Sequence, residues 1–152
     1  MTLVTQNEQG QMTYYHEDGL IGNLEKFSAA IERDTFATEE IRHRLALLLP
    51  EISRINNLEQ QSAETYITFT IEEMEKQIQA DPTNSKNYYV LGTFQLNIGR
   101  YEDALNNLLK AIEFSPEKQA MRLPLINLYF ATEQPEKAID VARETFELET
   151  SK

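Results

Sequence analysis

Two histidines, His16 and His43, are the residues of this sequence that could bind a metal ion. A protein metal site needs several ligands at once, and the sequence offers no partners that can be placed beside either histidine. His43 also stands between Arg42 and Arg44, where a cation would be repelled. We therefore expect both histidines to be solvated and predict no metal site.

The carboxylates of Glu72, Glu73 and Glu75 lie close enough in sequence to form an acidic cluster. Acid–base catalysis by paired carboxylates needs a pocket that shifts a pKa, and the sequence suggests none. Lys76 follows Glu72 by four residues, which is the spacing of an ion pair on a helix surface. This pattern favours a solvated helix face over a catalytic site.

Other catalytic and cofactor-binding motifs are missing from the sequence. It has no G-x-S-x-G elbow, no phosphate-binding loop and no dinucleotide fingerprint. It has no cysteine, which excludes disulfides and thiolate metal sites. We predict no enzyme activity and no cofactor. An enzyme with a hidden site between the N-terminal helices and the later ones is an alternative that the sequence leaves open.

The composition limits the kinds of partner. The 152 residues suffice for one domain with a real core, and the formal net charge is −11. Such a charge repels nucleic acid and anionic membranes and attracts a basic partner. No apolar run reaches the length of about 20 residues that spans a bilayer, and no signal peptide is visible. We therefore expect a protein or peptide partner, with no nucleic acid and no membrane insertion.

Residues 85–116 have the pattern of two antiparallel helices joined by a tight turn. Asn84 is a good N-cap for the first helix. Gly99 falls where a left-handed residue ends that helix, and Ser115-Pro116 ends the second. Gly92 and Ala104 are small residues in the middle of the two helices, which predicts that the helices cross closely there.

The spacing in this hairpin resembles the tetratricopeptide repeat, whose pattern is W-x2-L-G-x2-Y, A-x3-F and P over about 34 residues. The matching positions are Tyr88, Leu91, Gly92, Gln95, Ala104, Leu108, Ala111 and Pro116, with Gln95 departing from the expected aromatic residue. The resemblance implies an all-α fold, a right-handed α-solenoid of antiparallel helix pairs. An ordinary helical hairpin is the alternative.

The same period recurs on both sides of the hairpin. Leu125 follows Leu91 by 34 residues, Ala138 follows Ala104 by 34, and Pro82 precedes Pro116 by 34. The repeats are therefore assigned to residues 85–118 and 119–152. Within the second repeat the departures are Pro124, expected to kink or delay its first helix, Ile126 in place of the glycine, and Ala142 in place of the bulky residue.

The earlier part of the chain is less regular. We expect a flexible leader over residues 1–19, with a turn of helix around Met12–His16, and a single helical domain over residues 20–152. Degenerate helices are predicted over 22–33, 38–56 and 59–80, with Thr38 as a cap, a break near Leu49 caused by Pro50, and a turn at Asn56-Asn57.

The resemblance also implies where a partner binds, because the first helices of such repeats line a concave groove. The residues that would face this groove are Lys86, Tyr89, Thr93, Leu96, Asn97, Leu123, Asn127 and Phe130. The asparagines would bind a ligand backbone and the apolar residues its side chains. Plain packing or solvent exposure is an equally good reading of each. Tyr89 and Thr93 occupy the positions that bind a C-terminal carboxylate in some members, so we expect no such clamp.

A second resemblance covers residues 23–82. Thr35-Phe36, Thr38, Glu40-Ile41-Arg42 and the run from Glu72 to Ile78 are similar to the soluble tetratricopeptide tail of bacterial O-antigen polymerase or ligase-like membrane proteins. This resemblance implies a tail that helps glycan assembly through contacts. The compartment would be cytoplasmic for a stand-alone chain and membrane-tethered for such a tail.

The last helix carries an apolar face, with Ile139 and Phe146, that no later helix covers. Solenoids normally need a capping helix, so we predict a homodimer through this face. The leading hypothesis for the whole chain is a non-catalytic protein–protein interaction scaffold that holds a partner in the groove. The alternative is the soluble tail of a membrane polysaccharide polymerase.

Overall fold

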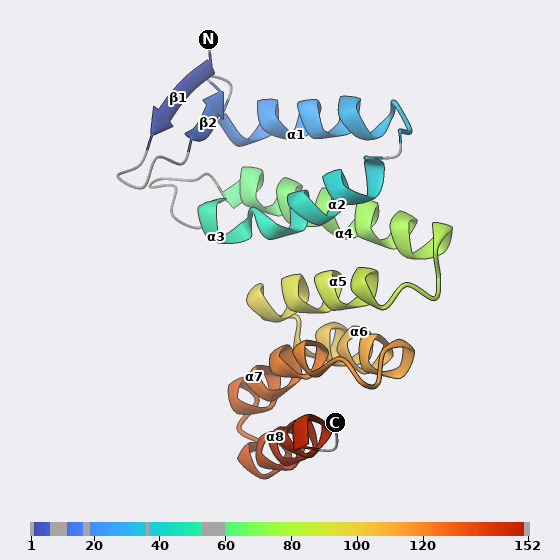
Figure 1. Cartoon of the computed structure of the whole chain (residues 1–152). Helices are drawn as coiled ribbons and strands as arrows, with labels where there is room; N and C mark the ends of the chain where they lie inside the picture. Colours follow the sequence, from blue (N-terminus) through green and yellow to red (C-terminus); the bar gives the residue numbers. More distant parts are fainter. Residues whose placement is uncertain (1, 7–11, 17–18, 36, 53–59, 151–152) are drawn as a thin grey trace. The chain divides into compact units, whose positions relative to one another are not determined.

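The computed structural model describes residues 2–6, 12–16, 19–35, 37–52 and 60–150 (Figure 1). Its elements in chain order are β1 (Thr2–Gln6), β2 (Met12–His16), α1 (Gly19–Ile31), α2 (Thr38–Leu47), α3 (Leu49–Ile52), α4 (Gln60–Ala80), α5 (Ser85–Asn97), α6 (Tyr101–Phe114), the 3₁₀ helix η1 (Gln119–Arg122), α7 (Leu123–Ala131) and α8 (Pro135–Thr150).

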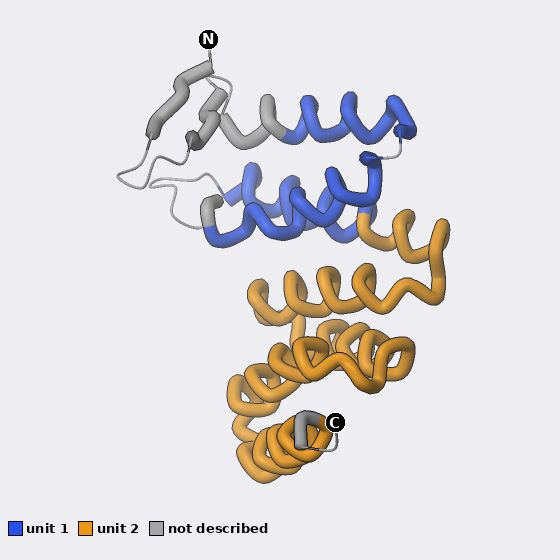
Figure 2. Tube along the Cα trace, in the orientation of Figure 1, with its two compact units in different colours: residues 1–73 blue, residues 74–152 orange. Residues whose placement is uncertain are grey.

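The chain divides into two compact units, Met1–Glu73 and Met74–Lys152 (Figure 2). The boundary falls inside α4, so this one helix contributes residues to both units. The sequence predicts a single domain over residues 20–152, and that stays a prediction.

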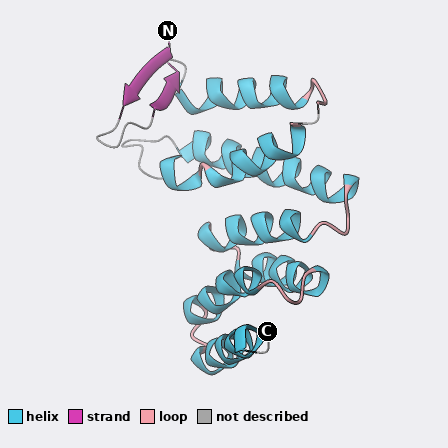
Figure 3. Ribbon diagram, in the orientation of Figure 1, coloured by secondary structure: helices cyan, strands magenta, loops and turns pink. Residues whose placement is uncertain are grey.

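A short antiparallel hairpin precedes the helices (Figure 3). Strand β1 pairs with β2 so that Val4 lies opposite Tyr14. The helical turn expected around Met12–His16 is therefore wrong. This segment is rich in β-branched and aromatic residues, which fit a strand better than a helix. The other described elements are helices, in agreement with the predicted fold class.

In unit 1 the helices confirm most of the predicted boundaries. The break expected at Pro50 is present, because α2 ends at Leu47 and α3 starts at Leu49. Thr38 does not cap α2 as predicted. It is the first residue of that helix, it is buried, and its hydroxyl accepts a hydrogen bond of 3.0 Å from the backbone N–H of Thr35. The turn predicted at Asn56-Asn57 lies outside the described residues.

In unit 2 the first helical hairpin consists of α5 and α6, and its ends follow the predicted local chemistry. The side chain of Asn84 accepts a hydrogen bond of 3.1 Å from the backbone N–H of Lys86, which satisfies one of the free donors of the first turn. Gly99 has a φ of 79°, the left-handed conformation that glycine adopts at no steric cost. Helix α6 ends at Phe114, just before Ser115-Pro116.

The small residues lie where the helices meet. Ala104 and Ala138 are fully buried, and Gly92 is buried as well. A Cβ atom placed on Gly92 would lie 2.9 Å from Cγ of Leu108, so no larger residue fits there without movement. The predicted close approach of α5 and α6 is thereby confirmed, and it explains why a glycine is accepted in the middle of a helix.

The second hairpin, α7 and α8, repeats this plan with local changes. Pro124 lies in the first turn of α7, and η1 precedes it, so the predicted delay of this helix is confirmed. Glu133 lies 34 residues after Gly99 and also has a positive φ, 56°. The turn between the helices thus keeps its backbone conformation even where the glycine has been replaced.

Candidate functional site

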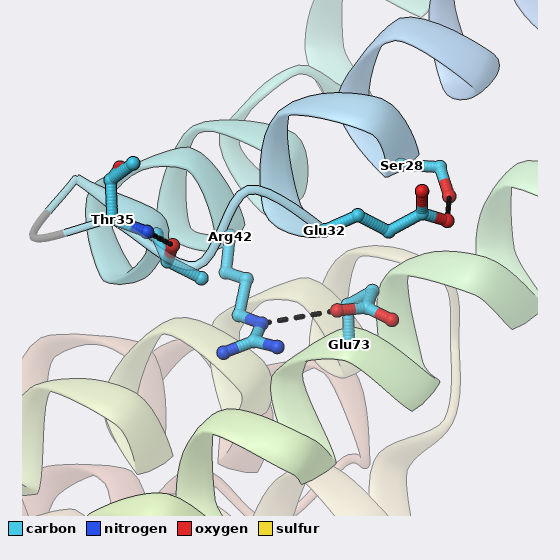
Figure 4. Close-up of polar contacts among 6 residues, drawn as sticks. Ser28, Glu32, Thr35, Arg42 and Glu73 are labelled. Carbon is cyan, nitrogen blue, oxygen red and sulfur yellow. Dashed lines mark hydrogen bonds and ion pairs between the residues drawn. The ribbon is translucent and has the colours of Figure 1, made fainter.

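The carboxylates around Glu73 form an ion pair rather than a solvated face. Arg42 Nε lies 3.1 Å from Oε2 of Glu73, and both side chains are largely buried (Figure 4). The prediction of a solvated cluster is therefore wrong for Glu73, whereas Glu72 and Glu75 are exposed as expected. The reason is the helical period, because Glu73 lies on a different side of α4 from its two neighbours.

A polar stripe on α4 contains this buried glutamate. Tyr66, Thr70, Glu73 and Gln77 follow one another at spacings of four, three and four residues, and all four are buried. This spacing places them on one face of the helix. The stripe was missed because polar residues at helical spacing look like a solvated face unless the contacts that bury them are known.

Tyr66 shows how the stripe is satisfied. Its hydroxyl donates a hydrogen bond of 2.7 Å to the backbone carbonyl of Leu45 on α2. Burial raises the pKa of Tyr66 well above its usual value, and a hydrogen bond with Thr70 offsets only part of that rise. The phenol is therefore held neutral, which suits a structural link between helices and not a proton donor at neutral pH.

His43 is also buried, with 1% of its surface exposed, so the expectation of a solvated histidine is wrong for this residue. It lies on α2, and its Nε2 is 3.9 Å from Oε1 of Glu39 one turn earlier. His16 is the last residue of β2, and its side chain is outside the described ones. Within the described parts of the chain, no group of three or more histidines, aspartates or glutamates is placed to hold a metal ion.

The residues predicted to line a groove lie on α5 and α7, two neighbouring helices of unit 2. On α5 the residues Ser85, Asn87, Tyr88, Val90, Leu91, Gly92, Phe94 and Gln95 are buried, and the predicted positions occupy the remaining face. On α7 Pro124, Leu125 and Leu128 are buried, while Leu123 and Phe130 keep 56% and 57% of their surface exposed. Such exposure of large apolar side chains is unusual in a packed repeat and indicates a contact surface.

Two of the predicted groove residues also support the core. Tyr89 packs against the cluster of Tyr88, Ala111 and Met121. Leu96 packs against a second cluster that includes Ala104 and Leu108. Both side chains are half-buried, so they belong to the packing of unit 2 as well as to its surface.

The polar positions of this face are open to solvent. Lys86, Asn97 and Asn127 are exposed, and Thr93 is half-buried. The described residues contain no hydrogen-bond partner for the Oγ1 atom of Thr93. We call the face formed by these residues together with Tyr89, Leu96, Leu123 and Phe130 the α5/α7 face.

Gln95, which departs from the repeat pattern, has a structural role that sequence reasoning missed. It is buried, and its Oε1 accepts a hydrogen bond of 2.7 Å from Nδ2 of Asn107 on α6. The amide pair links the two helices where the pattern expects an aromatic residue. The signal was available in principle, because a polar residue at a core position needs a polar partner.

Comparison with known proteins agrees with this architecture. A model of the tetratricopeptide repeat family matches residues 67–146, which is more than half of the chain. A search of curated proteins found no match. Among the helices in the described ranges, none has both the length and the apolar character needed to cross a membrane.

Solved structures with a similar fold include several of MamA. One of these aligns with a TM-score of 0.62 and 19% sequence identity, over 85% of this chain and 68% of the MamA chain. A second, MamA from Desulfovibrio magneticus RS-1 beginning at its residue 41, aligns with a TM-score of 0.61 and 18% identity, over 87% of this chain and 71% of its own. At these identities the likeness concerns the fold alone.

Proposed function

This chain belongs to the tetratricopeptide repeat family, and we propose that it is a non-catalytic scaffold that binds a protein or peptide on the α5/α7 face. The observation that carries the proposal is the exposure of Leu123 and Phe130, seven residues apart on one side of α7. A helix that exposes two large apolar residues at this spacing has an apolar stripe ready for a partner.

The chemistry of this face defines the ligand. Leu123 and Phe130 supply apolar contacts, and the exposed amides of Asn97 and Asn127 can each donate to and accept from a peptide backbone. The net charge of −11 attracts a basic ligand. We therefore propose a peptide that combines apolar side chains with lysine or arginine.

The alternative function, a tail of a membrane polysaccharide polymerase, stays a prediction. The described residues hold no feature that favours glycan chemistry over protein binding. Such a tail would act through contacts, so the α5/α7 face would serve it equally well.

A second copy of this chain is also a proposed protein partner. The sequence predicts a homodimer through Ile139 and Phe146, and both side chains are exposed on α8. This contact would use a different face from the peptide site.

The test begins with selection of random displayed peptides on the whole chain, followed by affinity measurement with a labelled peptide from the selected set. The double variant Leu123→Glu with Phe130→Glu should lose at least about tenfold in affinity, because truncation or reversal of apolar anchors removes most of a binding site. Asn127→Ala should lose less. Tyr89→Ala is a poorer probe, since Tyr89 also packs against the core.

The matched control is Leu109→Glu, which changes an exposed leucine of α6 outside the proposed site. Its affinity should stay within about twofold of the unmodified chain. Circular dichroism shows whether each variant keeps its helices. The proposal fails if no peptide is selected, or if the double variant binds as tightly as the control.

A further inference from the structure

Helix α8 carries an apolar stripe that no described residue covers. Ile139 and Phe146 keep 53% and 64% of their surface exposed, and Ala142 between them is exposed too. Their spacing of three and four residues places them on one face of the helix. The opposite situation holds for Ala138, which is fully buried against the rest of unit 2. We call the three exposed residues the α8 stripe.

The repeat itself shows what such a stripe receives. The residues 34 positions earlier are Leu105, Leu108 and Ile112 on α6. They share a core cluster with Leu125, Leu128 and Tyr129 of α7, the next helix in the chain. The same face of α6 is therefore covered by an apolar helix. By the internal equivalence of the repeats, the α8 stripe has the position and character of a surface that accepts a helix.

We propose that this helix is α8 of a second copy, packed antiparallel across a two-fold axis. The inference rests on the proposed function in that it names one protein partner, but it uses a face distinct from the α5/α7 face. The stripe suits pairing with itself, because the small Ala142 lies between two large residues at nearly equal distances. A two-fold axis near Ala142 sets Ile139 of one copy against Phe146 of the partner subunit.

The charges around the stripe make a distinctive prediction. None of its three residues is charged, and the nearby Arg143 already pairs with Asp140 on the same helix, Nη1 to Oδ1 at 3.3 Å. Each copy carries a net charge of −11, so two copies repel at long range. Added salt screens this repulsion and should strengthen the dimer. A complex with a basic peptide should respond in the opposite direction.

A single introduced cysteine tests the geometry directly, because the natural sequence has none. In Ala142→Cys the two thiols would meet near the axis, so mild oxidation should convert most of the chain into a disulfide-linked dimer. Glu144→Cys is the control, since residue 144 is exposed on the far side of α8 and should remain largely monomeric. Equal cross-linking of the two variants, or none in Ala142→Cys, would overturn the proposed axis.

Sedimentation measurements test the stripe without cross-linking. The average mass of the unmodified chain should rise with protein concentration and with salt, and Phe146→Glu should abolish the rise while leaving the helices intact. Leu109→Glu, a change at an exposed leucine of α6, should behave like the unmodified chain. A chain that is monomeric at every concentration and salt refutes the dimer. Peptide binding that persists in Phe146→Glu shows that the α5/α7 face stands independently.

Discussion

The two units of this chain stabilise their helices by different means. In unit 1 polar groups are buried and satisfied across helices, as in the pair of Arg42 with Glu73 and the bond from Tyr66 to the carbonyl of Leu45. In unit 2 small residues allow large apolar ones to approach, as Gly92 does for Leu108. The difference teaches that repeat spacing specifies packing by size, whereas buried polar contacts depend on particular partners far apart in sequence.

The largest effect should come from the size-based packing of unit 2. Leu108 is fully buried in a cluster with Ala104, Leu125 and Leu128. Leu108→Ala should lower the free energy of unfolding by about 3 to 4 kcal/mol, because it removes buried apolar surface and leaves a cavity. Urea denaturation measures the loss. The neighbouring exposed leucine supplies the control, Leu109→Ala, and a similar loss there would contradict the assignment of the core.

The polar packing of unit 1 should show a somewhat smaller effect. Glu73→Ala should cost about 3 kcal/mol of unfolding free energy, because the largely buried Arg42 loses its carboxylate partner. The exposed neighbour provides the control, Glu72→Ala, with an expected change within about 0.5 kcal/mol. Replacing both Arg42 and Glu73 by leucine should recover much of the loss. If the double variant is no more stable than Glu73→Ala, the ion pair is not what the single change removes.

The smallest of the three effects concerns the close approach at Gly92. Gly92→Ala places a methyl group against Leu108, and we expect a net loss of about 1 to 2 kcal/mol, since overpacking exceeds the gain in helix propensity. In the Leu108→Ala background the same change should become neutral or stabilising. A double-mutant cycle measures this reversal. An unchanged cost in both backgrounds would rule out the clash as the cause.

The sequence predicts unit 2 well because periodicity carries the relevant information. The caps at Asn84 and Gly99 and the small residues at Gly92 and Ala104 are local or periodic features, and the structure confirms them. The candidate surface on α5 and α7 follows from the same spacing, and the structure leaves Leu123 and Phe130 exposed there. Their role in binding stays a proposal.

Unit 1 could be predicted only in outline, for a physical reason. The solvated reading of His43 and Glu73 failed because both residues look polar in sequence and are buried in the structure. Glu73 is matched by Arg42, 31 residues earlier, and no repeat spacing connects the two. The strand at Met12–His16 was likewise missed, since its pairing with β1 is a contact between segments.

Hydrogen exchange of the whole chain, with and without a saturating peptide from the selection described above, tests the central claim most directly. The account predicts that bound peptide slows amide exchange in residues 85–97 and 123–131, the helices of the α5/α7 face, and leaves residues 19–35 and 37–52 unchanged. Slowed exchange confined to unit 1, with α5 and α7 unaffected, would contradict it.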